Sequence, residues 1–153
     1  MPIPIEERAD KIREEHEFLK GEMGKLNYMI CETVTPENFP KWRLDLLWLL
    51  RDFLNHLQKH FDLEEDGGFM SDILDVAPHK QHAVEKLATE HEEMVKSFSG
   101  IIASLKSLQE KDDDRIADIC ERIQVAVEML KAHESAEGEL IESTYLQDEG
   151  AGD

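Results

Sequence analysis

Apolar residues recur at alternating spacings of three and four in four separate stretches of this chain. Such spacing places the repeated side chains on one face of an α-helix, here called a seam, which packs against other helices. The four seams consist of Ile5, Ala9, Ile12, His16, Leu19, Met23, Leu26 and Ile30; Leu46, Leu50, Phe53, Leu57, His60 and Glu64; Val84, Leu87, His91, Met94, Phe98, Ile101, Leu105 and Leu108; and Ile116, Ile119, Ile123, Ala126, Leu130, His133, Glu137 and Leu140. The pattern predicts an all-α fold, an up-down-up-down antiparallel four-helix bundle.

Three turn-rich stretches, residues 33–40, 66–78 and 110–114, separate the seams. The aspartates of the third stretch offer N-caps for a helix, and Pro78 suits the first turn of the third long helix. Short connections favour antiparallel neighbours. We therefore expect a single domain over residues 1–146, followed by a disordered acidic tail over residues 147–153.

The charge of the chain disfavours several classes of partner. There are 17 Lys and Arg against 35 Asp and Glu, a net charge of −18, so nucleic acid and anionic membrane surfaces are repelled on average. The N-terminus lacks the apolar stretch of a signal peptide, and no window approaches the ~20 apolar residues of a membrane span. Cys31 and Cys120 lie far apart and outside any CxxC pattern, which indicates reduced thiols. We expect a cytoplasmic protein that binds neither nucleic acid nor membrane.

Ionisable residues interrupt the apolar seams. They are His16, His60, Glu64, His91, His133 and Glu137. An unpartnered polar group in an apolar interior costs a few kcal/mol, and the stability of a whole domain is only ~5–15 kcal/mol. These groups must therefore bind one another or a ligand. Imidazole nitrogens and carboxylate oxygens without thiolates are a typical ligand set for a transition metal that is not soft.

The spacing of these residues favours two metal ions. His and Glu stand four residues apart in "HFDLE" (residues 60–64) and again in "HESAE" (residues 133–137), one helical turn or ~6 Å along the axis. Each of these helices thus offers one nitrogen and one oxygen to neighbouring points. We expect two histidines on each metal, with His16 and His91 completing the sets, Glu64 and Glu137 shared, and a solvent-derived oxo or hydroxo bridge.

At these residues the chain resembles the hemerythrin-like, or HHE cation-binding, domains. The family pattern is a lone His on the first helix, HFxxEE on the second, EH on the third and HxxxE on the fourth. Here the matching residues are His16, "HFDLEE" at residues 60–65, "EH" at residues 90–91 and "HESAE" at residues 133–137. The resemblance extends from about Ile5 to about Glu142. It implies a non-haem site of two iron ions that meets dioxygen, nitric oxide or peroxide.

One departure from the oxygen-carrying hemerythrins concerns the third helix. The carriers have two histidines there at i and i+4, but the positions four residues before and after His91 are Leu87 and Val95. The fourth helix has HxxxE where the carriers usually have HxxxxD. The four-His, two-Glu pattern resembles the HHE subgroup linked to peroxide decomposition, to iron and oxygen sensing, or to stress responses. What replaces the fifth histidine is left open.

Two functions of different classes follow from the same residues. The first is a binding module that takes up O₂, NO or iron itself in sensing, storage or stress protection. The second is a catalase-like enzyme that decomposes peroxide, so whether the chain is an enzyme stays open. A purely structural helical adaptor and a b-type haem bundle with His and Met ligands are further alternatives. The ExxH, HExxH and CxxCH patterns of ferritin-like, zincin and c-type haem proteins are absent.

Other polar and aromatic residues have simpler interpretations. His56 and three glutamates, Glu65, Glu90 and Glu92, are expected to face solvent or to contact the ligating side chains from outside. His79 and His82 lie off the seam and are expected on a solvated face. The large aromatic residues are expected to pack in the core: Trp42, Trp48, Phe53 and Phe98.

Overall fold

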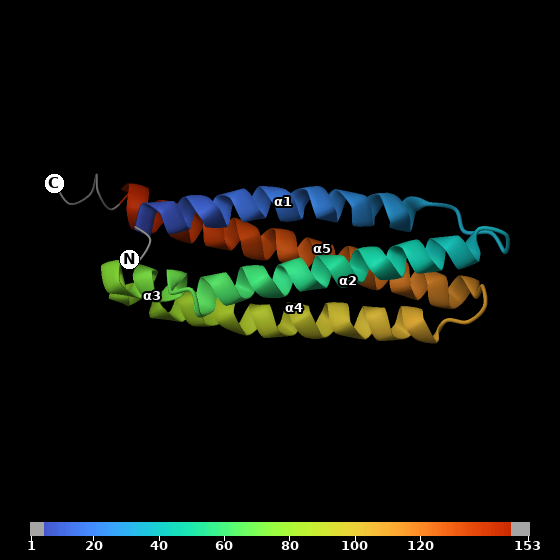
Figure 1. Cartoon of the computed structure of the whole chain (residues 1–153). Coiled ribbons are helices and arrows are strands. Elements are labelled where there is room, and N and C mark those ends of the chain that lie inside the picture. Colours follow the sequence, from blue (N-terminus) through green and yellow to red (C-terminus); the bar gives the residue numbers. More distant parts are fainter. Residues whose placement is uncertain (1–4, 148–153) are drawn as a thin grey trace.

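In the computed structural model of the protein, which describes residues 5–147, four long helices pack antiparallel to one another (Figure 1). They are α1 (Ile5–Cys31), α2 (Phe39–Glu65), α4 (Gln81–Ser107) and α5 (Asp113–Ile141). Each long helix contacts two others, in the pairs α1 with α2, α2 with α4, α4 with α5, and α5 with α1. The predicted fold class, an up-down-up-down four-helix bundle, is confirmed.

The connections between the long helices have local physical causes. In the first connection, the Thr35 amide donates to Asn38 Oδ1 at 2.7 Å and the Asn38 amide donates to Thr35 Oγ1 at 3.2 Å. These reciprocal bonds form the turn before α2, and Pro40 falls in the first turn of that helix, where its missing N–H costs nothing. At the start of α5, Asp112 Oδ1 accepts from the Arg115 amide at 3.2 Å, so the predicted aspartate N-cap forms.

The predicted seams form the core. From Ala9 to Leu26 in α1, and along all three other seams, their apolar residues are buried. The core has two apolar clusters: a larger one that includes Leu19, Leu57 and Leu130, and a smaller one that includes Ile12 and Leu87. The six ionisable seam residues form a polar layer between the two clusters.

One aromatic residue does not lie where we predicted. Trp42, Phe53 and Phe98 are buried, and the rings of Phe53 and Phe98 meet edge to face at 5.1 Å. Trp48, however, is 62% exposed. It lies two residues after Leu46 and two before Leu50, so helical geometry directs it away from the core-facing seam.

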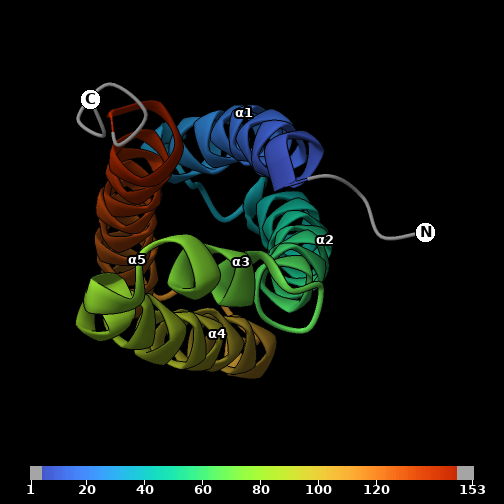
Figure 2. The ribbon, with the colours of Figure 1, turned by 90° about the vertical axis from the view of Figure 1, so that its left-hand side faces the viewer.

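The second predicted break contains a helix that the periodicity did not predict. Residues 66–78 hold α3 (Phe69–Val76), which lies across one end of the bundle (Figure 2) and buries Phe69, Met70 and Ile73 in the smaller apolar cluster. A 3₁₀ turn, η1 (Pro78–Lys80), leads directly into α4, so Pro78 lies at the predicted helix start. Eight residues are too few for a helical period to stand out.

The C-terminal part of the fold continues α5 as a π-helix, η2 (Glu142–Gln147). Most of the predicted disordered tail, residues 148–153, lies outside the described residues. Within residues 5–147, no helix is both long and apolar enough to cross a membrane. Cys31 and Cys120 are both free thiols, as predicted.

Candidate metal centre

The predicted ligands converge in one layer of the bundle, at the half nearer α3. His16 comes from α1, His60 and Glu64 from α2, His91 from α4, and His133 and Glu137 from α5. All are buried except His16, which is partly buried. All four long helices therefore contribute to one polar cluster, as the seams predicted.

The ligand atoms of these residues divide into two overlapping sets of four. The first set comprises His16, His60, Glu64 and Glu137, and the second comprises Glu64, His91, His133 and Glu137. Within each set, one potential ligand atom from every residue lies within 4.8 Å of the others. Both glutamates belong to both sets. Each set thus contains two histidines and the same two glutamates, a grouping that could hold metal.

The inner nitrogens of the histidines all point at these carboxylates. Glu64 Oε1 lies 3.1 Å from His60 Nε2 and 3.4 Å from His91 Nε2. Glu137 Oε2 lies 3.3 Å from His16 Nε2, and its Oε1 contacts His133 Nε2. The cluster therefore presents imidazole nitrogens and carboxylate oxygens to a common interior.

These inner atoms fit a bound cation because the protein itself leaves them unsatisfied. The Nε2 atoms of all four histidines and both carboxylate oxygens of Glu64 and Glu137 are buried and have no hydrogen-bond partner. Buried polar groups are nearly always hydrogen-bonded, so such a group of orphaned acceptors needs an explanation. A cation of borderline hardness would satisfy nitrogen and oxygen acceptors together. The donor set thus supports a metal site.

A second layer of carboxylates holds the outer nitrogens of three histidines. His60 Nδ1 lies 2.5 Å from Glu15 Oε2, His91 Nδ1 lies 3.0 Å from Glu65 Oε2, and His133 Nδ1 lies 2.8 Å from Glu90 Oε1. In each pair the glutamate belongs to the preceding long helix. Metal-binding histidines typically donate their other N–H to such a group, which fixes the tautomer and directs Nε2 at the metal.

Only part of this outer layer of glutamates was predicted from the sequence. Glu65 and Glu90 were predicted to face solvent or contact the ligands, and they do contact His91 and His133. Glu15 was missed. It directly precedes His16, whereas its partner His60 is on another helix, so only the packing of α1 on α2 brings the pair together. The one available signal was its place on the α1 face next to the seam.

An aromatic ring also positions His91. Phe61 stacks on the imidazole of His91 with ring centroids 3.8 Å apart and an interplanar angle of 12°. Phe61 directly follows His60 in the chain and is itself buried. The stack and the Glu65 contact together restrict rotation of the His91 ring, which keeps Nε2 directed inward.

The charges of the cluster perturb its titration. Burial raises the pKa of Glu64, but interaction with His60 and His91 outweighs burial and lowers that pKa to about 2. Burial likewise lowers the pKa of His60, yet Glu64 and Glu15 raise it above its usual value. Burial dominates at His16 and His133 and lowers the pKa of both. Glu64, one of the two carboxylates that belong to both sets, is therefore ionised at neutral pH, as a ligand must be.

The remaining histidines lie outside the cluster. His56 Nδ1 is 3.8 Å from Asp52 Oδ2, and its ring meets Phe18 edge to face at 5.0 Å. His79 and His82 are exposed, as is Glu92. The predicted distinction between seam and off-seam histidines thus agrees with the structure.

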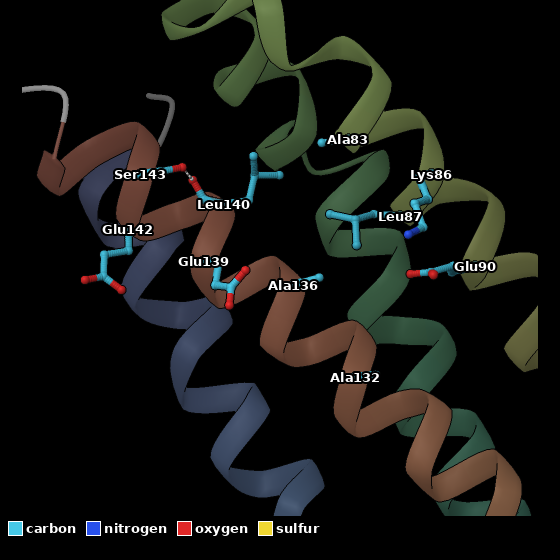
Figure 3. A pocket seen from close by; sticks show the side chains of 10 residues that line it. All are labelled: Ala83, Lys86, Leu87, Glu90, Ala132, Ala136, Glu139, Leu140, Glu142 and Ser143. Carbon is cyan, nitrogen blue, oxygen red and sulfur yellow. Dashed lines mark hydrogen bonds between the residues drawn. The ribbon is translucent and has the colours of Figure 1, made fainter.

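A surface groove between α4 and α5 approaches the second ligand set from outside. It has a volume of about 570 Å³, and its lining includes Leu87, Glu90, Ala132 and Ala136 (Figure 3). Glu90 is the residue that contacts His133, and Leu87 occupies the position four residues before His91. The alanines are small and exposed, which leaves the groove open. The groove ends against the outer layer and is not lined by the predicted ligands themselves.

Comparisons with family models, curated proteins and solved structures found no match to this chain. The class of protein therefore rests on the fold and the site. It is a four-helix bundle with a buried cluster of histidines and glutamates that could hold metal.

Proposed function

We propose that the chain is a non-haem di-iron protein of the hemerythrin-like type, which binds O₂, NO or iron itself in sensing, storage or stress protection. The observation that carries the proposal is the set of inward-facing acceptors without hydrogen-bond partners, which come from all four long helices and form two overlapping groups. The motif resemblance supports iron as the metal.

Each residue has a defined part in this proposal. His16 and His60 would hold one ion, His91 and His133 the other, and Glu64 and Glu137 would bridge them. The carboxylates of Glu15, Glu65 and Glu90 fix the histidine rings from outside. Iron, when bound, supplies redox chemistry and open coordination positions for a small ligand. The apolar clusters on both sides of the layer restrict solvent.

The structural adaptor is less well supported, for an energetic reason. A bundle that needs only stability gains from apolar residues at seam positions, and buried ionisable groups without partners oppose folding. Here eight of the orphaned atoms belong to the six residues of the two ligand sets, whose ligand atoms are grouped closely together. A structural role gives no reason for this grouping.

The second candidate function is peroxide decomposition, and a specific observation favours it. The second ligand set lacks the further histidine that the oxygen carriers have four residues from their other one, since this chain has Leu87 and Val95 around His91, and the α4–α5 groove reaches Leu87. The ion held by His91 and His133 would thus have fewer protein ligands and a route by which a small reactant can approach. Oxidation by peroxide needs such an exposed ion.

The two functions are separated by what the iron-loaded protein does with its reactant. Purified protein would be loaded anaerobically with ferrous iron, and its optical spectrum followed after addition of air, NO or peroxide. A binding module forms a stable, stoichiometric adduct. An enzyme consumes many equivalents of peroxide and returns to its starting spectrum.

The matched controls are His133→Ala, which removes a predicted ligand, and His82→Ala, which removes an exposed histidine. Adduct formation or peroxide consumption lost in His133→Ala and kept in His82→Ala supports a function at this site. Equal behaviour of both variants and the original chain contradicts it.

A further inference from the structure

One carboxylate of the polar layer has no place in the ligand sets or in the outer layer. Glu134 lies on α5 between His133 and Glu137, and it is half-buried. Its Oε1 atom is completely buried and has no hydrogen-bond partner. An ionised oxygen in such a position opposes folding unless a cation or a donor satisfies it.

In this respect Glu134 differs from the outer carboxylates and is similar to the bridging ones. Glu15, Glu65 and Glu90 each contact a histidine Nδ1 within 3.0 Å. Glu64 and Glu137, in contrast, have buried oxygens that make no hydrogen bond, as does Glu134. Among the carboxylates of residues 5–147, this property belongs to Glu64, Glu137 and Glu134.

The position of Glu134 associates it with the first ligand set. Burial raises the pKa of Glu134, while the nearby histidines His16 and His60 lower it and the Glu64 carboxylate raises it further. It also lies three residues before Glu137, so the two carboxylates share a face of α5. Glu137 contacts His16 of α1 at 3.3 Å. Glu134 is therefore on the side of α5 that is turned toward the first set.

We propose that Glu134 is an additional carboxylate ligand of the metal ion held by His16 and His60. This inference rests on the proposed metal-binding function. In the present structure the Glu134 carboxylate lies outside both sets of four, so it would reach the ion by a change of side-chain rotamer. The charge of a bound cation provides the driving force for that change.

The proposal makes the two metal positions unequal. The first would have His16, His60, the two shared glutamates and Glu134. The second would keep only His91, His133 and the shared glutamates. An external ligand would consequently bind at the second position, which the α4–α5 groove approaches through Glu90 and Leu87.

The arrangement of the outer layer suggests a competing role for Glu134. Each of the other three histidines is contacted by a glutamate of the preceding long helix. If the same order continued around the bundle, His16 of α1 would be contacted by a glutamate of α5, the neighbouring helix that carries Glu134. As an outer residue Glu134 would affect affinity only, whereas as a ligand it would also change the coordination number of the ion.

The test is anaerobic titration of the full chain with Co²⁺, which reports both affinity and coordination number. Co²⁺ with fewer ligands absorbs more strongly in the visible region. The variants are Glu134→Gln, Glu134→Ala and, as a matched control, Glu121→Gln, an exposed glutamate on the same helix. Circular dichroism of each metal-free variant verifies that it folds.

We expect the original chain and Glu121→Gln to bind two Co²⁺ ions. In both Glu134 variants, one of the two ions should bind roughly tenfold more weakly or worse, and its visible absorption should intensify. Weaker binding with an unchanged spectrum overturns the ligand role in favour of an outer one, and unchanged binding excludes both roles. These results leave the proposed function intact, whereas a chain that binds no metal contradicts it and removes the basis of this inference.

Discussion

The carboxylates on the outer nitrogens show how single residues prepare this cluster. Glu90 contacts His133 Nδ1 at 2.8 Å, which selects the tautomer with a free Nε2. The negative charge also makes the imidazole a stronger ligand. Replacement of the charge by an amide should weaken the metal site without disturbing the core.

We predict that Glu90→Gln lowers the affinity of the second metal position by about 10- to 100-fold, the usual effect of losing such a partner. Glu92→Gln, an exposed glutamate on the same helix, is the matched control and should leave affinity unchanged. Competition with a chromophoric chelator measures both. Equal affinities in the two variants would show that the Glu90 contact does not support metal binding.

The titration of His60 predicts how metal affinity depends on pH. Burial opposes its charged form, but Glu64 and Glu15 raise its pKa above the usual 6.5. The proton on His60 must leave before a metal binds, so affinity should fall as pH decreases through the raised pKa. His16 and His133, with lowered pKa values, lose their protons at lower pH.

The expected result is a decline in affinity that begins above pH 6.5 and approaches about tenfold per pH unit for each proton displaced. Glu15→Gln removes one of the interactions that raise the pKa and should move the start of the decline to lower pH. Glu17→Gln is the exposed control. A metal affinity that does not change between pH 8 and pH 6 would be incompatible with metal binding by His60.

Among the helices, the seams of the four long ones were predictable from the sequence, whereas α3 at the end of the bundle was not. A seam repeats over several turns, so each residue such as Ile12 or Met94 adds to one pattern, and its burial follows from helix geometry. Helix α3 has no room for repetition, and its place depends on tertiary contacts with Ile12 and Leu87. The sequence did not predict which histidine each outer glutamate contacts for the same reason, since the two partners lie on different helices.

The turn before α3 depends on a glycine. Gly68 has φ +91°, a conformation that other residues adopt only with strain, and a Cβ there would lie 3.3 Å from Arg8 Nη1. Arg8 pairs with Asp72 of α3, so the same turn brings α1 and α3 together. We predict that Gly68→Ala destabilises the fold by about 1–2 kcal/mol, as measured by urea unfolding.

The control for that prediction is Gly21→Ala, an exposed position in α1 with open space around a Cβ and no positive φ. Alanine should stabilise the helix there by up to about 1 kcal/mol. If Gly68→Ala is as stable as the original chain, the left-handed turn does not contribute to docking of α3. Metal stoichiometry should be unchanged in both variants because neither residue contacts the cluster.

The groove between α4 and α5 is the proposed route by which small reactants reach the second metal position. Ala136 is exposed and lines the groove together with Glu90 (Figure 3), the residue that contacts His133 of the second ligand set. A leucine there should fill part of the groove and slow the reaction of the loaded protein with azide or peroxide, while metal content stays the same. Ser97→Leu, in a separate groove that is lined by none of the predicted ligands or outer glutamates, is the control. Stopped-flow rates that are equal in both variants would rule out the α4–α5 groove as the route.

For the molecule as a whole, the arrangement places a layer of buried ionisable groups between two apolar clusters. Such a layer opposes folding when its acceptors are unsatisfied, and a metal that binds only the folded state stabilises it by mass action. The free energy of unfolding of the bundle should therefore increase when metal binds. Chelation should lower the melting temperature, and metal should restore it.

We propose that the six seam residues hold two metal ions, and the metal content per chain tests this proposal. Freshly purified protein, after anaerobic loading with ferrous iron and removal of the excess, would be analysed by elemental mass spectrometry beside His60→Ala, His133→Ala and the exposed-site control His82→Ala. We predict two irons per chain in the original protein and in His82→Ala, and one or none in the other two. No retained iron, or equal retention in all four proteins, would contradict the claim.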